Sequence, residues 1–236
     1  MSGERFLPAI AAALADVQNE GDSISTLSMV KLFEKILMVF DHLGPVLLFA
    51  KQDMYSKCES LKQAAATHAT LKQMVEADKA AGVVTKKNSC GRNLHRLNAV
   101  LTFMRLLLFK LLEDANISIK DAASFAYQQA LSPIHPYVVR TAVWAGMYVL
   151  PSRQVFMTSI GETEESAREP STTFTNGAEA VEAAILALYD EPMPASDVAP
   201  TSMFTTASWW GGSATAKADA ATEVGTSAPI TSTQPL

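Results

Sequence analysis

Cysteine is scarce in this chain, and signals for export or membrane insertion are missing. Cys58 and Cys90 are the only cysteines among 236 residues, too few for a disulfide framework. Residues 1–5 lead into only a short apolar stretch, which does not resemble a signal peptide. The most apolar run, residues 101–112, contains two basic residues and is about half as long as the roughly 20 apolar residues of a membrane-spanning helix. We therefore expect no transmembrane helix and a reducing, cytosolic setting.

The sequence also lacks the usual signatures of catalysis and of metal binding. It contains no Gly-rich phosphate loop, no nucleophile elbow and no H-E-x-x-H motif. Around His135, no second histidine, cysteine or carboxylate lies at metal-ligand spacing. The net charge of -5 argues against general nucleic-acid binding, because that function needs Lys and Arg spread over one surface. We expect a protein that is not an enzyme, holds no metal or other cofactor, and meets any anion with a local basic cluster.

Helical periodicity is the dominant pattern from about residue 4 to about residue 189. Apolar residues recur at helical spacing, whereas the alternation of apolar and polar residues that is typical of strands is missing. The predicted fold class is therefore all-α. The expected helices cover about 4–19, a segment capped by Ser25 or Thr26, a segment opened by Pro45, a shorter one around 71–75, and then about 92–113, 120–132, 135–151, 154–159 and 177–190.

The composition changes near residue 191. From there to residue 236, Ala, Ser, Thr, Pro and Gly dominate, charge is sparse and apolar residues lose their period. We expect one helical domain over residues 1–190 and a disordered, low-complexity tail over residues 191–236. Within the tail, Trp209 and Trp210 are either a pair that dips into a membrane interface or a chance aromatic pair.

A charged pair lies on an otherwise apolar helix face. Asp53 and Lys57 are one helical turn apart, so they share a face. That face continues back through Ala50, Phe49 and Val46. Such pairs are common on protein surfaces, where they contribute only about 0.3–0.5 kcal/mol. The spacing alone leaves open a surface ion pair and a part of a binding site.

Two arginines stand one turn apart at the start of the most apolar predicted helix. Arg92 and Arg96 repel each other by a few tenths of a kcal/mol at this spacing unless an anion lies between them. Their stripe then turns apolar, through Ala99, Phe103, Leu106 and Leu107. This change from basic to apolar matches an amphipathic lipid, with a phosphate at one end and hydrocarbon at the other. The alternative is a pair of solvated arginines at a helix start.

Four segments, in their order and spacing, carry a resemblance to a known family. They are Phe40-Asp41-His42-Leu43-Gly44-Pro45-Val46, Arg92-Asn93-Leu94-His95-Arg96-Leu97, Ala126-Tyr127 with the run into His135, and Arg140-Thr141-Ala142 with Met147-Tyr148-Val149-Leu150-Pro151. Together they resemble the glycolipid transfer protein family, specifically its ceramide 1-phosphate branch, which includes the plant accelerated-cell-death proteins. The resemblance covers about residues 25–190. It implies a two-layer helical sandwich of about eight helices that opens to admit lipid chains between its layers.

The resemblance implies a site that reads the ceramide amide. Asp53 would accept the amide hydrogen of the sphingoid base, and His135 would donate to the carbonyl of the acyl chain. After its histidine the family usually has a glycine and a tryptophan or similar aromatic, whereas this chain has Pro136 and Tyr137. Tyr137, apolar in its body and polar at its tip, is the candidate membrane-interface residue.

Headgroup choice, by the same resemblance, depends on two positions. Sugar-binding members carry an asparagine where Lys57 stands and a sugar-stacking tryptophan where Arg96 stands. Here both residues are cations, and Arg92 adds a third. Arginine forks fit phosphate oxygens, so these three residues are the candidate phosphate ligands.

The function implied is non-enzymatic transfer of a phosphosphingolipid, ceramide 1-phosphate first, between membranes during transient peripheral contact. The candidates for the hydrocarbon-chain pocket are Phe33, Phe40, Phe49, Phe103, Leu107, Val138, Val143 and Met147. One alternative keeps the fold and takes a neutral glycosphingolipid. Another is a helical interaction module in cell-death or stress signalling, which senses lipid and binds a protein partner that the sequence does not identify.

Overall fold

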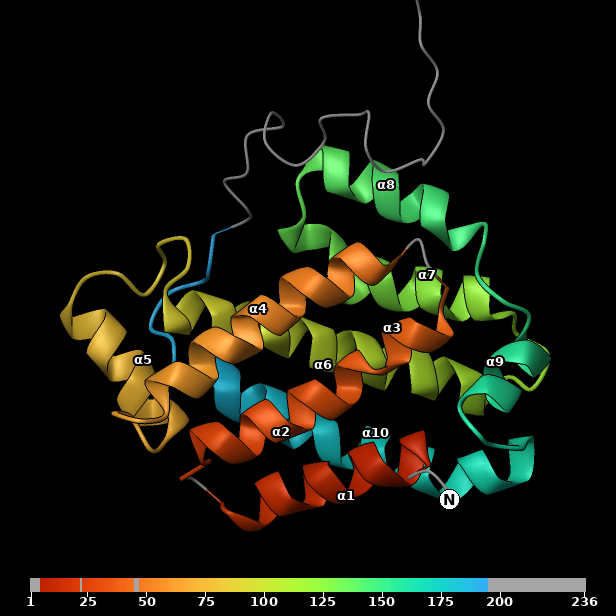
Figure 1. Cartoon of the computed structure of the whole chain (residues 1–236), viewed down its shortest axis with the longest axis horizontal. Helices are drawn as coiled ribbons and strands as arrows, with labels where there is room; N and C mark the ends of the chain where they lie inside the picture. The colour runs from red at the N-terminus through yellow and green to blue at the C-terminus, as the bar shows by residue number, and fades with distance from the viewer. Residues whose placement is uncertain (1–4, 22, 45–46, 195–236) are drawn as a thin grey trace, which may run out of the picture. The chain divides into compact units, whose positions relative to one another are not determined.

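The computed structural model describes residues 5–21, 23–44 and 47–194, except the side chain of Phe49. Within these ranges the chain forms ten α-helices and one 3-10 helix, and the only strand-like pairing is an isolated bridge between Ser25 and Thr70. The elements are α1 Phe6–Asn19, α2 Thr26–Leu37, α3 Val39–His42, α4 Leu48–Ala64, α5 Leu71–Ala80, α6 Cys90–Glu113, α7 Ile119–Ala130, η2 Ser132–Ile134, α8 Tyr137–Met147, α9 Arg153–Ser159 and α10 Glu164–Leu186 (Figure 1). The all-α prediction is confirmed, and two of the ten helices, α3 and α9, are short.

Serine and threonine side chains fix where most of these helices begin. In each case the side-chain oxygen accepts a hydrogen bond from the backbone N–H three residues later, which satisfies a donor that the first turn leaves unpaired. Thr70 and Thr163 form complete capping boxes with Gln73 and Ser166. The capping residues are Ser25, Thr70, Ser89, Ser118, Ser152 and Thr163. The predicted start of α2 after Ser25 is confirmed, whereas Pro45 lies outside the described residues and α4 is described from Leu48.

Helix α6 is the centre of the packing. It contacts α10, α7 and α4 along its length, while α1 lies against α2 and α10. Figure 1 shows α1, α2 and α4 in front of α6, α7 and α10, the two layers of the helical sandwich. No helix in the described ranges is both long enough and apolar enough to cross a bilayer.

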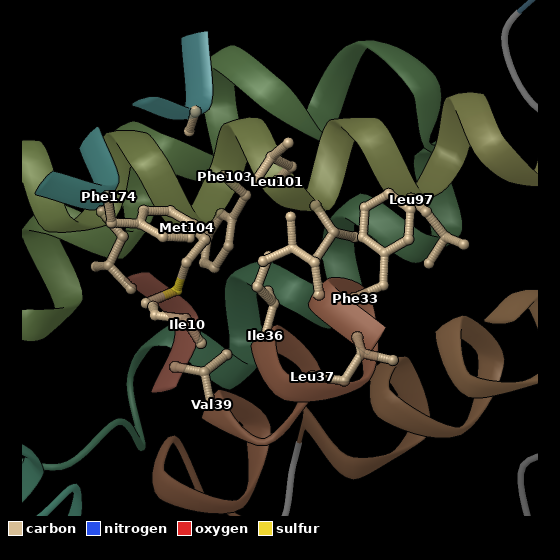
Figure 2. Packing of buried hydrophobic residues seen from close by; sticks show 14 of the residues in the cluster. Ile10, Phe33, Ile36, Leu37, Val39, Leu97, Leu101, Phe103, Met104 and Phe174 are labelled. Carbon is tan, nitrogen blue, oxygen red and sulfur yellow. The ribbon is translucent and has the colours of Figure 1, made fainter. Parts of the chain in front are cut away.

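The space between the layers is filled by apolar side chains. Ile10 of α1, Phe33 of α2, Met104 of α6 and Phe174 of α10 are all completely buried. In Figure 2, Ile10, Met104 and Phe174 lie in one group although they come from three different helices. Burial of such residues removes roughly 25 cal/mol of unfavourable hydration free energy per Å² of apolar surface, which holds the two layers together.

The last helix is longer than the sequence predicts. Helix α10 starts at Glu164, not near residue 177, and it runs through Pro170. Proline removes one backbone hydrogen bond from a helix interior, so Pro170 carries a local cost. Pro170 is buried, and α10 packs against both α6 and α1, so tertiary packing outweighs the local cost. At Gly177 an added Cβ would lie 2.7 Å from Gln18 Oε1 and 3.0 Å from Leu14 Cδ2, so α1 and α10 approach closely there and a larger residue would need these side chains to shift.

An ion pair joins the two long helices of the back layer. Arg105 of α6 donates from Nε to Glu182 Oε1 at 2.7 Å and from Nη2 to Glu182 Oε2 at 3.0 Å. The side chain of Glu182 is 8% exposed and that of Arg105 is 21% exposed, so the pair is largely shielded from water. This two-point geometry fixes the rotation of α10 relative to α6.

The substitution Arg105→Leu is expected to lower the free energy of unfolding by about 2 kcal/mol, because it leaves the Glu182 carboxylate buried without its cation. Complete burial of a broken pair costs about 3–5 kcal/mol, and the partial exposure of Arg105 reduces that. Urea denaturation followed by circular dichroism measures the change. The matched control is Lys72→Ala, which breaks the exposed pair with Glu76 and should shift stability by less than about 0.5 kcal/mol. Equal destabilisation by both variants would contradict the claim that the pair of Arg105 and Glu182 stabilises the fold more than an exposed pair does.

Candidate functional site

The two arginines of α6 are buried, although they begin a helix. Ser89 caps α6 by accepting from Arg92 N, which places Arg92 in its first turn and Arg96 one turn further. Arg92 is 6% exposed and Arg96 is 7% exposed, so neither is a solvated side chain. Arg92 Nη1 donates to the Thr85 carbonyl at 2.8 Å, and Arg96 Nη2 donates to the Pro194 carbonyl at 2.6 Å. Burial of two like charges one turn apart is unfavourable unless acceptors or an anion surround them.

Asp53 and Lys57 form an ion pair on α4, the helix that packs against α6. Lys57 Nζ lies 2.7 Å from Asp53 Oδ2, and it also reaches the Asp53 carbonyl at 3.4 Å. The Lys57 side chain is 17% exposed and that of Asp53 is 41% exposed. The lysine is therefore mostly covered, while the carboxylate stays open to a molecule arriving from outside.

His135 lies between the 3-10 helix η2 and the start of α8, where Pro136 is the N-cap residue. The pKa of His135 is lowered to about 4, chiefly by burial and then by the charge of Arg96, while Asp53 raises it and Lys57 adds a smaller lowering. These three charges act on one imidazole, so the structure brings Arg96, Lys57 and Asp53 into the neighbourhood of His135. On α6 itself, His95 lies between Arg92 and Arg96, and its pKa is lowered to about 4 by burial, the largest cause, and by these two charges.

Two aromatic residues that the sequence analysis did not single out as site residues also contact this cluster. Tyr127 of α7 is 1% exposed, and its hydroxyl lies 3.1 Å from His135 Nδ1. Burial raises the pKa of Tyr127 to about 12, so its hydroxyl keeps its proton. Tyr189, beyond α10, donates from its hydroxyl to the Gly91 carbonyl at 2.6 Å. Gly91 and Tyr189 are far apart in the chain, so their contact leaves no spacing signal in the sequence. Tyr127, in contrast, stands only eight residues before His135.

The residues predicted for the hydrocarbon-chain pocket lie in the packed core. Most are buried there, and Val138 is half-buried, while the side chain of Phe49 lies outside the description. The buried ones are Phe33, Phe40, Phe103, Leu107, Val143 and Met147. Any core helix places such residues inside, so their contact with lipid chains stays a prediction.

Tyr137 is the first residue of α8 and is 74% exposed, beside the half-buried His135. Its role at a membrane interface stays a prediction. Trp209 and Trp210 lie outside the described residues, as does the expected tail from residue 195 onward.

A small cavity of about 80 Å³ opens at another place, among α1, α6, α9 and α10. Leu7, Leu108 and Phe156 contribute to its apolar wall, and none of the predicted pocket residues lines it. Within the described ranges, no three His, Cys, Asp or Glu side chains gather closely enough to hold a metal ion.

Comparison with known proteins places this geometry in context. The family model described as Glycolipid transfer protein (GLTP) matches residues 24–162. The ACD11 homolog protein of Arabidopsis thaliana is 34% identical over 134 residues, 57% of this chain and 58% of that protein. Accelerated cell death 11 of the same plant is 32% identical over 139 residues, 58% of this chain and 68% of that protein. The matched segment thus spans less than two thirds of the first relative.

A solved structure extends the likeness over a larger share of the chain. It is the crystal structure of a point mutant of Arabidopsis accelerated-cell-death 11 complexed with C12 ceramide 1-phosphate. It matches with a TM-score of 0.75 and 25% identity, over 78% of this chain and 95% of that chain. The likeness supports the arrangement of helices on which the site residues stand.

His135 is expected to stay neutral well below pH 6.5, because burial and the neighbouring cations disfavour its charged form. Nuclear magnetic resonance titration of the folded chain should give a midpoint near 4, and the urea-unfolded chain a midpoint near the ordinary 6.5. The unfolded chain therefore binds more protons between these values, so the free energy of unfolding should fall as pH drops from 6.5 toward 4. The variant His135→Gln should flatten part of that slope, with His95 supplying the remainder. A folded-state midpoint near 6.5 would contradict the burial argument.

Proposed function

The chain belongs to the glycolipid transfer protein family, and we propose that it carries single phosphosphingolipid molecules, ceramide 1-phosphate first, between membranes. The family is one of lipid transfer proteins, so the proposed activity is binding and release without a chemical step. A relative with the same fold is known in complex with ceramide 1-phosphate, which supports the choice of ligand.

The observation that carries the proposal is the burial of Arg92 and Arg96 at the start of α6, together with a mostly covered Lys57 on α4, a helix that packs against α6. Three cations and the Asp53 carboxylate leave a local charge of about +2, which complements the roughly -1.5 to -2 of a phosphomonoester at neutral pH. Hydrogen bonds between guanidinium groups and phosphate oxygens are charge-assisted and roughly twice as strong as neutral ones. A phosphate would therefore relieve the repulsion between the arginines, which a neutral sugar would leave in place.

Recognition of the ceramide amide follows from the protonation of His135. The Tyr127 hydroxyl keeps its proton and lies 3.1 Å from His135 Nδ1, and we propose the tautomer in which this hydroxyl donates a hydrogen bond to Nδ1. The neutral imidazole then carries its own proton on Nε2, where it donates to the acyl carbonyl of the lipid. Asp53, which is partly exposed, accepts from the amide N–H. A lipid without an amide leaves one of these groups unpaired, at a cost of about 1–3 kcal/mol.

The chains are proposed to enter between the two helix layers, against the buried residues Phe33, Phe103 and Leu107. Because these side chains pack against one another in the described structure, the layers must separate as the chains enter. Contacts between chain and side chain then replace contacts within the core, so the exchange has little net hydrophobic cost.

We place the protein in the cytosol, with transient contact to membrane surfaces. The exposed Tyr137, one residue past the N-cap of α8 and close to His135, supports a docking point beside the headgroup site. Two alternatives keep the same site, a neutral glycosphingolipid as ligand and a role in lipid sensing for a protein partner. A neutral glycosphingolipid does not account for the cations as directly, whereas a sensing role keeps the same ligand and differs in what the bound protein does.

Replacing either Lys57 or Arg96 by alanine is expected to slow transfer of ceramide 1-phosphate between vesicles by about 10-fold or more, the loss of one charge-assisted hydrogen bond. The helical circular dichroism should stay intact, because neither residue carries the core packing. The matched control is Lys62→Ala, on the same helix as Lys57. The exposed side chain of Lys62 pairs with Glu34 and Glu59, and this variant should transfer lipid normally.

Unchanged transfer by Lys57→Ala and Arg96→Ala would overturn the assignment of the phosphate ligands. Competition in the same assay tests the lipid class. Excess unlabelled glucosylceramide should leave transfer of labelled ceramide 1-phosphate unaffected, and strong inhibition would favour the neutral glycosphingolipid.

A further inference from the structure

The residues that follow α10 lie against the N-terminal end of α6, where two of the proposed phosphate ligands stand. We call residues 187–194 the C-terminal strap, which leaves α10 in a turn and becomes irregular (Figure 1). The Tyr189 hydroxyl donates to the Gly91 carbonyl at 2.6 Å, and its ring meets the ring of His95 edge-on at 5.7 Å. Asp190 pairs with Lys79 of α5 at 2.9 Å. The strap is thus anchored to α5 and to the first turns of α6.

The far end of the strap reaches a candidate phosphate ligand. The carbonyl of Pro194 accepts from Arg96 Nη2 at 2.6 Å, across 98 residues of sequence. The same guanidinium nitrogen is one that a phosphate oxygen would use under the proposed function. A nitrogen at full hydrogen-bond contact with the carbonyl is occupied on that side, so the strap and the phosphate compete for it.

The sequence of the strap suits this position. Pro192 and Pro194 fix their φ angles and cannot continue α10, so the end of the strap stays extended. Because the prolines restrict the unbound strap as well, less conformational entropy is lost when it lies down on α6. The carbonyl is neutral, however, and its hydrogen bond to Arg96 is weaker than that of a dianionic phosphate oxygen.

We propose that the C-terminal strap is a displaceable lid of the headgroup site, in which the Pro194 carbonyl holds Arg96 until a lipid phosphate replaces it. The inference rests on the proposed function, because it takes the phosphate of ceramide 1-phosphate as the competitor. Tyr189 and Asp190, the anchors of the strap, are not among the proposed phosphate ligands, so a change at either alters the closed state while the ligands stay in place. A closed lid lowers the apparent affinity for lipid by the fraction of molecules that are open.

The anchor Tyr189 gives the first test, with the full chain and vesicles of phosphatidylcholine that contain ceramide 1-phosphate. Tyr189→Phe keeps the ring on His95 and removes the hydrogen bond to Gly91, so it should favour the open strap. Apparent affinity for the vesicles should rise about two- to tenfold, the range for one net hydrogen bond. Tyr55→Phe, which removes an exposed hydroxyl on α4, is the matched control and should bind like the unsubstituted chain. An unchanged or lower affinity of Tyr189→Phe would overturn the proposal.

Hydrogen exchange of the unsubstituted chain gives a second test that does not depend on a variant. Vesicles with ceramide 1-phosphate should raise backbone exchange in residues 187–194, whereas vesicles with ceramide, which lacks the phosphate, should not. Increased protection of the strap by ceramide 1-phosphate would make it part of the bound headgroup site and overturn competition. Equal deprotection by both vesicles would also overturn it. If the unsubstituted chain binds ceramide 1-phosphate vesicles no better than plain phosphatidylcholine, the proposed function itself fails, an outcome distinct from these.

Discussion

The burial of two like charges one helical turn apart, at Arg92 and Arg96, is the constraint around which this site is built. A guanidinium can leave water only where acceptors replace its hydration. Arg92 Nη1 donates to a backbone carbonyl at 2.8 Å, and Arg96 Nη2 donates to another at 2.6 Å. The helices that surround α6 supply the rest of the environment, with Asp53 and Lys57 on α4 and Tyr127 on α7. An apolar two-layer sandwich thus ends in a cationic site at one end of its central helix, a polarity that suits a phosphorylated lipid.

The same burial sets the protonation of the neighbouring histidines. His95 and His135 each have a pKa near 4, for the same two reasons, loss of water and nearby cations. Both are therefore neutral at physiological pH and add no positive charge to the site. A neutral His135 in hydrogen-bond contact with Tyr127 can donate from Nε2 in the proposed tautomer, while Lys57, Arg92 and Arg96 are the positive groups proposed for a phosphate.

Local features of the sequence predicted most of the helices, because caps such as Ser25 and periodic apolar residues act within a few positions. The prediction failed at α10, where Pro170 and Gly177 weaken the helical signal and packing against α1 and α6 restores the helix. In the site, the spacing of Arg92 and Arg96 favoured an anion between them, whereas the roles of Asp53 and Lys57 came from the family resemblance. The positions of Tyr189 and Pro194 over α6 could not be predicted, since contacts across 98 residues depend on the completed fold.

The central claim is that the site holds a phosphosphingolipid, and the most direct measurement identifies the lipid that the protein carries in its own cells. Native mass spectrometry of the purified full chain, followed by fragmentation of the released ligand, gives both stoichiometry and headgroup. The account predicts one lipid per chain, with a ceramide backbone and a phosphomonoester headgroup. A neutral glycosphingolipid or a diacylglycerol phospholipid in its place would contradict it.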